Sequence, residues 1–259
     1  MPSTINGTKL SAQEFWDALL LRYARSPGDL PSQCDGCGAA FSVRHALECK
    51  TGGLVIMRHN EITEELCDLA SKALTPSAIR LKPMINNGGN AASVKTPDPK
   101  APVQRLHTFD EERGDLLIRG FWARGTDAII DVRVTDTDAK SYRSKDPHKV
   151  LAQQEKEKKR KYLQPCLAQR KHFTPFVVST DGLLGRKATE LLKRLSLRLA
   201  DKWQRPYSVV RGFVNARISI AICRATHLCL RGSRVSLSKT SRRPLWEDRA
   251  GLGLFRTDY

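Results

Sequence analysis

The sequence contains no hydrophobic run long enough to cross a membrane. Its 259 residues include no uninterrupted apolar stretch near the roughly 18 residues that a membrane helix requires. The first ten residues, MPSTINGTKL, also lack the apolar segment of a secretory signal peptide. We therefore expect an intracellular protein, nuclear or cytoplasmic, that has no membrane as its partner.

Acidic residues are scarce in the second half of the chain. Residues 1–138 carry 16 basic and 18 acidic side chains, whereas residues 139–259 carry 28 basic and 9 acidic ones. The formal net charge of +17 is thus concentrated in one half, which indicates a polyanionic partner such as nucleic acid. A hydrophobic content of 40% is sufficient for a buried core and argues against wholesale disorder.

The seven cysteines are an odd number, in a chain without a secretion signal, so a disulfide framework is not expected. Three of them form a short pattern with a histidine, Cys34-x2-Cys37-x7-His45-x3-Cys49. Zinc prefers such sulfur and nitrogen donors, and four protein ligands leave no position open for catalytic water. The pattern predicts a structural zinc knuckle, with a cluster of free thiols beside a surface histidine as the alternative.

The hydrophobic periodicity predicts a mixed α/β fold with no internal repeat. In the first expected helix, Ser11 and Glu14 match a capping box, and Phe15, Leu19 and Tyr23 are four residues apart. Pro83 would confine the expected strand 79–85 to a sheet edge or end it. The expected strand 173–180 contains adjacent apolar residues, which indicates burial on both faces. Helices are expected over 11–25, 58–74, 147–171, 185–204 and 206–231, and strands over 79–85, 115–122, 127–135 and 173–180.

Composition divides the chain into parts. We expect a helical segment and linker (1–33), the zinc knuckle (34–52), a main α/β domain (53–234) and a loose basic tail (235–259). Residues 86–104 are rich in Gly, Pro and Asn and are predicted to be a flexible insertion in the main domain.

Two aspartates lie in the adjacent expected strands. Asp115 begins one strand and Asp131 lies within the next, so an antiparallel pairing would bring their carboxylates together. Carboxylate oxygens suit Mg²⁺, and such an ion can activate water against a phosphodiester. Solvated or turn-forming aspartates are the alternative. Asp127 is expected in a turn, and Asp136 and Asp138 are further candidate ligands.

These motifs, in this order, resemble one region of a known family. The zinc-type pattern, then Arg58-His59-Asn60-Glu61, then Asp115, Asp131 and a basic helix with Lys158 before Tyr162, resemble the C-terminal part of reverse-transcriptase polyproteins of early-branching, site-specific non-LTR retrotransposons. That region is a zinc knuckle followed by a restriction-enzyme-like, or PD-(D/E)xK, endonuclease. The segments FWARGTDAIIDVRV and FTPFVVSTDG also look like the ends of transposon-derived proteins. The resemblance covers about residues 12–234 and implies an α-β-β-β-α-β core.

The resemblance also implies roles for single residues. Asp115 matches the Asp of the PD motif, with Gly114 in place of Pro, and Asp131 matches the second acid. Lys158 matches a displaced catalytic Lys, whereas Arg133 stands where Lys is common and cannot act as a base. Glu61 corresponds to an additional metal-linked acid found in some of these nucleases.

Several basic residues are candidates for contacts with nucleic acid. Arg58 and His59 begin the second expected helix, where Asn60 as a simple N-cap is the alternative. The basic helix and the last helix either present phosphate-binding stripes or simply expose solvated faces, and their candidates are Lys156, Lys159, Arg160, Arg211 and Arg217.

The implied function is a Mg²⁺-dependent DNA endonuclease that nicks target duplex DNA to prime reverse transcription, with element RNA as a further partner. The chain has no Tyr-x-Asp-Asp polymerase signature, so the reverse-transcriptase domain is expected upstream in a longer parent. The alternative is a decayed or domesticated form of the same fold that only binds nucleic acid.

Overall fold

The computed structural model describes residues 7–85 and 113–235. Over these ranges the chain forms a four-stranded sheet in the order β1-β2-β3-β4, with antiparallel pairs except for the parallel pair β3-β4. The strands are β1 (Ile79–Leu81), β2 (Leu116–Arg119), β3 (Asp127–Thr135) and β4 (His172–Ser179). The helices are α1 (Ala12–Arg22), α2 (Val43–Glu48), α3 (Leu54–Ala73), α4 (Pro147–Ala168), α5 (Arg186–Trp203) and α6 (Tyr207–Arg231).

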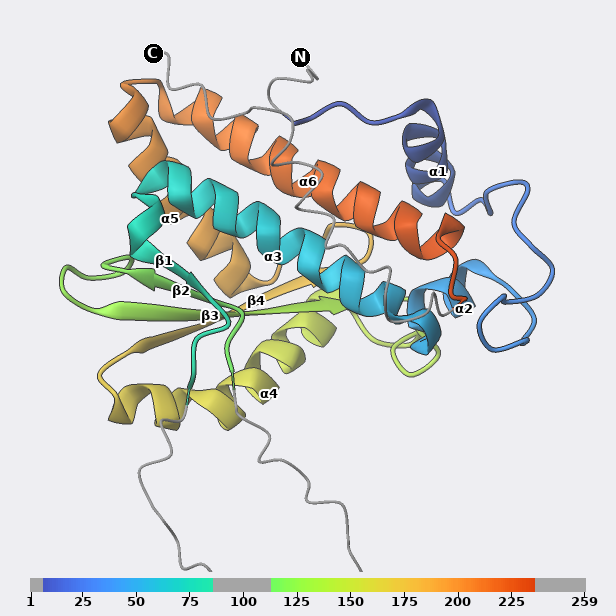
Figure 1. The fold of residues 1–259 in the computed structure, drawn as a ribbon, viewed down its shortest axis with the longest axis horizontal. Helices are drawn as coiled ribbons and strands as arrows, with labels where there is room; N and C mark the ends of the chain where they lie inside the picture. Colours follow the sequence, from blue (N-terminus) through green and yellow to red (C-terminus); the bar gives the residue numbers. More distant parts are fainter. Residues whose placement is uncertain (1–6, 86–112, 236–259) are drawn as a thin grey trace, which may run out of the picture.

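Helices cover both faces of the sheet, which explains why β4 is buried along nearly its whole length. Helix α4 lies on one face, and α3, α5 and α6 lie on the other, while α1 and α2 sit at one end of α6 (Figure 1). The larger apolar core fills the space between the sheet and α3, α5 and α6, and a smaller one lies under α4. In the described part of the chain, no helix has the combined length and apolarity needed to traverse a bilayer.

Alternation along β3 decides which side chains face which layer. Ile130 and Val132 point into the larger core, while Ile129 points into the core under α4. Because successive side chains alternate, Asp131 and Arg133 also point towards α4. The basic helix therefore packs directly over the strand that carries the second candidate acid.

The mixed α/β class and the order of the predicted elements are confirmed, and most ends shift by only a few residues. The strands predicted over 79–85 and 115–122 are shorter than expected, at Ile79–Leu81 and Leu116–Arg119. Short helix α2 was not predicted, because its six residues lie inside the Cys/His pattern and are too few for periodicity. Helix α3 also begins earlier than expected, at Leu54. The expected insertion (86–104), and all but the first residue of the expected tail (235–259), lie outside the described residues.

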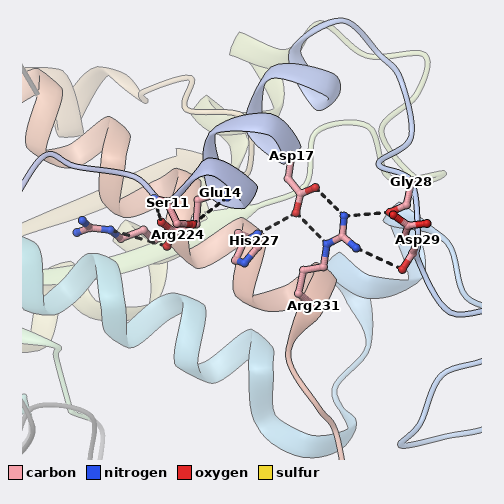
Figure 2. Close-up of polar contacts among 8 residues, drawn as sticks. All are labelled: Ser11, Glu14, Asp17, Gly28, Asp29, Arg224, His227 and Arg231. Atoms are coloured by element: carbon pink, nitrogen blue, oxygen red, sulfur yellow. Dashed lines mark hydrogen bonds and ion pairs between the residues drawn. The ribbon is translucent and has the colours of Figure 1, made fainter.

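Helix α1 is attached to α6 by charge rather than by its aromatic stripe. Asp17 is buried and accepts hydrogen bonds from Arg231 (2.8 and 3.0 Å) and His227 (2.8 Å), as Figure 2 shows. The Arg231 guanidinium also donates to the carbonyl oxygens of Gly28 and Asp29, which fixes the segment after α1. An amphipathic helix ordinarily buries its apolar stripe. Here the exposed side chains include Phe15, Trp16 and Tyr23.

Candidate functional site

The four residues of the Cys/His pattern converge in space. The Sγ atoms of Cys34 and Cys37 lie 4.0 and 3.9 Å from the Sγ of Cys49, and Cys37 Sγ is 3.4 Å from His45 Nε2. All four ligand atoms lie within 4.8 Å of one another. A tetrahedral zinc ion with Zn–S bonds of about 2.3 Å requires sulfur–sulfur separations of about 3.8 Å. The cluster therefore has the donors and the spacing to bind a structural zinc.

Local backbone geometry explains why this short segment can bring the ligands together. Gly38 has a positive φ of 73° and its N–H donates to the Cys34 carbonyl (2.9 Å), which closes the first turn. Ser42 then caps α2 by accepting from the N–H of His45 (3.1 Å). Burial raises the pKa of the Cys34 thiol, but hydrogen bonds from Cys37, Gly36 and His45 outweigh it and lower the pKa to about 6. A thiol of this kind is readily available as a thiolate, the form that binds metal.

Two buried arginines attach this cluster to the rest of the protein. Arg58 donates to the Leu47 carbonyl (3.1 Å), and Arg234 donates to the carbonyls of Ala46 (3.0 Å) and Cys229 (2.5 Å). Both therefore bind carbonyl groups near the C-terminal end of α2, which carries partial negative charge. Arg58 was expected to contact nucleic acid, but its side chain is enclosed and structural, so we do not assign it to a DNA surface.

The second candidate site lies where β2 and β3 separate. Their ladder ends at the pair Leu116–Ile130, beyond which the Asp115 N–H still donates to the Ile130 carbonyl (3.0 Å). The next donor on β3, the N–H of Val132, is satisfied by Oδ2 of Asp115 (2.6 Å) instead of by a main-chain oxygen. The Asp115 carboxylate is thus fixed in the opening between the two strands.

Asp131 is directed into the same region from β3 and is 4% exposed. Its Oδ2 lies 2.7 Å from Nζ of Lys158 on α4 but makes no well-aligned hydrogen bond. Burial raises the pKa of Asp131, the charge of Lys158 opposes that rise, and the charge of Asp115 adds to it. The structure therefore places Lys158 against Asp131, and Asp115 is near enough for its charge to add to the raised pKa of Asp131.

His59 of α3 completes this group from the other face of the sheet. Its Nε2 lies 3.1 Å from Oδ2 of Asp115, and its Nδ1 lies 3.3 Å from Oδ1 of Asn60. Burial lowers the pKa of His59, but the hydrogen bond and charge of Asp115 outweigh this, so the pKa is raised overall. His59 was expected to contact nucleic acid, and that contact stays a prediction. Nothing in the spacing of the sequence signalled its contact with Asp115.

Glu61 points to a different side of α3. Residues two apart on a helix are separated by about 200° around its axis, so His59 and Glu61 cannot both face Asp115. The contact from α3 to the carboxylate is made by His59. A metal-linked role for Glu61 stays a prediction.

The departure from the PD motif has a structural reason. The N–H of Gly114 donates to the carbonyl of Pro83 (2.9 Å), a bond that proline could not make. A Cβ at this position would also overlap the buried side chain of Ile129. Glycine at 114 therefore keeps the expected edge strand joined to the residue before Asp115.

Helix α4 carries charged residues with different surroundings. Arg133 of β3 pairs with the half-exposed Glu157 (3.2 Å), so its charge is partly neutralised. Glu155, from the run expected to be solvated or phosphate-binding, is buried and accepts from the N–H of Lys187 at the start of α5 (2.8 Å). The candidates that remain accessible on α4 are Lys156 and Arg160, which are exposed, and Lys159, which is partly exposed.

The arginines spaced along α6 are mostly engaged in contacts with other helices. Arg217 lies 2.6 Å from Glu65 and 2.8 Å from Asp68 of α3, and Arg224 donates to the Lys9 carbonyl (2.6 Å). Burial lowers the pKa of Arg217, but its two acidic partners raise it overall. Arg211 is partly buried, and its Nη1 makes no hydrogen bond. This stripe therefore joins helices, and contacts of Arg211 and Arg217 with DNA stay predictions.

The other candidate acids lie apart from this group. Asp127, which was expected in a turn, is instead the first residue of β3, at the opposite end of its ladder with β2 from Asp115. Asp136 accepts from the N–H of Asp138 (3.0 Å), and burial raises the pKa of Asp136. Among the residues that the structure describes, the Cys/His cluster alone brings three or more Cys, His, Asp or Glu side chains close enough to share one ion as placed.

Comparison of the sequence with protein-family models and with curated proteins found no match. The chain has a mixed α/β fold, a Cys₃His cluster suited to structural zinc, and a group formed by Asp115, Asp131, Lys158 and His59 at the point where two strands separate.

Proposed function

We propose that this chain is a metal-dependent DNA endonuclease with a restriction-enzyme-like core, of the kind found beside reverse transcriptases in site-specific non-LTR retrotransposons. The observation that carries the proposal is the approach of Lys158 Nζ to Asp131 (2.7 Å) beside the fixed carboxylate of Asp115. The order α3-β1-β2-β3-α4-β4 supports it, because this is the α-β-β-β-α-β order implied by the resemblance.

The donor set fits a hard divalent cation. Asp115 and Asp131 supply carboxylate oxygens, and the buried Oδ2 of Asp131 lacks a well-aligned hydrogen bond. When bound, Mg²⁺ would lower the pKa of water and stabilise charge on the phosphate. Lys158 would hold the phosphate or orient the attacking water. The DNA backbone would be contacted by other basic residues of α4, namely Lys156, Lys159 and Arg160. The zinc cluster would orient the duplex.

Nicking of supercoiled plasmid tests this function. Asp115→Ala, Asp131→Ala and Lys158→Ala should each reduce Mg²⁺-dependent nicking by at least 100-fold and leave DNA affinity within about threefold. Asp127→Ala is the matched control, because this acid begins the same strand outside the group. If the unmodified protein never nicks plasmid with Mg²⁺ or Mn²⁺, the enzyme proposal is wrong.

The second candidate is a decayed nuclease that binds nucleic acid through its basic half. The observation that favours it is the Arg133–Glu157 pair, because an arginine that cannot lose its proton occupies the position where Lys is common. Both candidates predict salt-sensitive binding, since each neutralised phosphate changes the slope of log K against log salt by about 0.9 on duplex DNA. Only the first predicts cleavage.

A further inference from the structure

We infer that the outward side of helix α1 is a binding surface for single-stranded DNA, on which exposed aromatic rings stack against unpaired bases. The inference rests on the proposed function, because a nick in duplex DNA allows one strand to separate from the other. The key observation is that Phe15, Trp16 and Tyr23 are 57%, 56% and 71% exposed on a helix that is fixed from its opposite side.

The position of each side chain around α1 explains this exposure. Successive residues of a helix are separated by about 100°, so the three aromatic rings fall within an arc of about 100°. Asp17 lies about 150° from the middle of that arc, and its contacts with Arg231 and His227 hold its side of the helix against α6 (Figure 2). The pairing at Asp17 therefore turns the rings outward.

The charges of α1 are divided in the same way. Its two acidic residues are Glu14 and Asp17, and both face α6, where Glu14 lies 4.0 Å from Arg224. Arg22, in the last turn, and Arg25, just after the helix, are exposed instead. Neither arginine forms an ion pair with any other residue in the ranges that the structure describes. The outward side therefore presents rings and guanidinium groups without a carboxylate of the helix among them.

This composition fits unpaired bases and their phosphates. The leucines of α1, at positions 19–21, are turned partly inward, so the large apolar side chains that the helix exposes are all aromatic. Aromatic rings stack on any base, and a basic groove beside them follows the phosphates, which is how proteins bind single strands without reading the sequence. The bases of a duplex are stacked on one another and offer no free face to such rings. The surface therefore suits a single strand rather than a duplex.

Fluorescence anisotropy tests the surface, with a labelled oligothymidine of about 15 nucleotides, the full zinc-loaded chain and no added Mg²⁺ or Mn²⁺. We expect Trp16→Ala and Tyr23→Ala each to weaken oligothymidine binding at least about fivefold, the loss expected for one stacked base. Duplex binding should stay within about twofold. Trp16→Phe should keep most of the affinity, whereas Trp16→Leu, which keeps an apolar side chain without a ring, should behave like Trp16→Ala.

Two further variants separate phosphate contact from general effects. Arg22→Gln should reduce the slope of log K against log salt by about 0.7, the value for one phosphate of a single strand. Tyr207→Ala is the matched control and should change neither affinity nor slope. Tyr207 is also an exposed aromatic residue (39%), but it begins α6, whereas α1 pairs with the other end of that helix. Circular dichroism and the thermal midpoint establish that each variant is folded.

Unchanged oligothymidine binding in Trp16→Ala, or equal binding by Trp16→Leu and Trp16→Phe, would overturn the inference. Tighter binding of an oligouridine of the same length, lost in Trp16→Ala, would assign the surface to RNA instead. A loss of self-association in Trp16→Ala with oligothymidine binding intact would assign it to a second copy of the chain. The proposed function fails separately: if the chain binds oligothymidine through Trp16 but never nicks plasmid, the surface stands and the nuclease does not.

Discussion

Gly52 and Arg234 lie so close together that no side chain fits between them. A Cβ on Gly52 would overlap the Cα of Arg234, and one on Gly36 would lie 2.6 Å from the Cβ of the same arginine. The guanidinium of Arg234 also lies over the ring of Phe41, at 5.3 Å from its centroid. The segment after α6 is therefore packed against the loops that carry the Cys/His cluster, and the close approach of the main chains there depends on glycine.

The adjacent glycines Gly52 and Gly53 provide a matched test of this packing. Both have positive φ angles (74° and 76°), so alanine is strained at either position by about 1–2 kcal/mol. Only at Gly52 does the new methyl group also meet backbone, since nothing lies within 4 Å of a Cβ at Gly53. Chemical denaturation should show Gly52→Ala to be clearly less stable than Gly53→Ala. Equal losses of stability in the two variants would mean that backbone strain alone accounts for the effect of each substitution.

Removal of the metal from the Cys/His cluster should unfold that region. Cys34→Ser should lose about one zinc per chain by atomic absorption and lower the thermal midpoint by at least about 5 °C, since each 1 kcal/mol is worth about 2–4 °C at this size. Cys223→Ser is the control, because Cys223 lies on α6 outside the cluster. Retention of zinc by Cys34→Ser would refute the ligand set.

Asp17 should make the protein sensitive to acid. Burial raises the pKa of Asp17, but hydrogen bonds from Arg231 and His227 outweigh it and lower the pKa below its ordinary value of 3.8. Because the folded state holds the charged form more strongly, this stabilisation is complete above about pH 4 and is lost as pH falls through the lowered pKa. Asp17→Asn should therefore be less stable near neutral pH and show a shallower loss of stability below pH 4.

The control for Asp17→Asn is Asp201→Asn, at the exposed end of α5. Urea unfolding at several pH values measures both variants. A pH profile for Asp17→Asn that matches the unmodified chain would contradict the role of the Asp17–Arg231 contact.

Glu155 should stabilise α5 from a distance. Helix α5 begins after Gly185, which offers no side chain to cap it, and Glu155 of α4 accepts from the Lys187 N–H instead. Loss of a helix cap costs about 0.5–2 kcal/mol. Glu155→Ala should lose stability in this range, whereas Glu157→Ala, two residues along the same helix and half exposed, should lose less than about 1 kcal/mol. A larger loss of stability in Glu157→Ala than in Glu155→Ala would contradict the capping role of Glu155.

The element order of the described fold could be read from periodicity and turn residues, because helices such as α5 and strands such as β3 have clear patterns. The Cys/His ligands could also be predicted, since all four lie within 16 residues of sequence. The orientation of α1 could not. Its aromatic stripe suggested a buried face, but a single aspartate paired with Arg231 determines which side faces α6.

Contacts between distant parts of the chain account for the other differences. Arg58 and Arg217 were expected to bind phosphate. Arg58 is buried against the carbonyl of Leu47, and Arg217 pairs with carboxylates of α3, so that its contact with DNA stays a prediction. The grouping of Asp115, Asp131 and Lys158 was anticipated only through the family resemblance, because spacing alone does not place α4 over β3. The approach of His59 to Asp115 joins residues 56 positions apart and left no local signal.

The contact of Arg234 with the carbonyl of Ala46 has a consequence for the order of events during synthesis. Arg234 follows Ala46 by 188 residues. At translation rates of about 5–20 residues per second, all four ligands of the Cys/His cluster are synthesised on the order of 10–40 s before the arginine that binds α2. Zinc binding by the cluster therefore does not depend on the prior synthesis of Arg234.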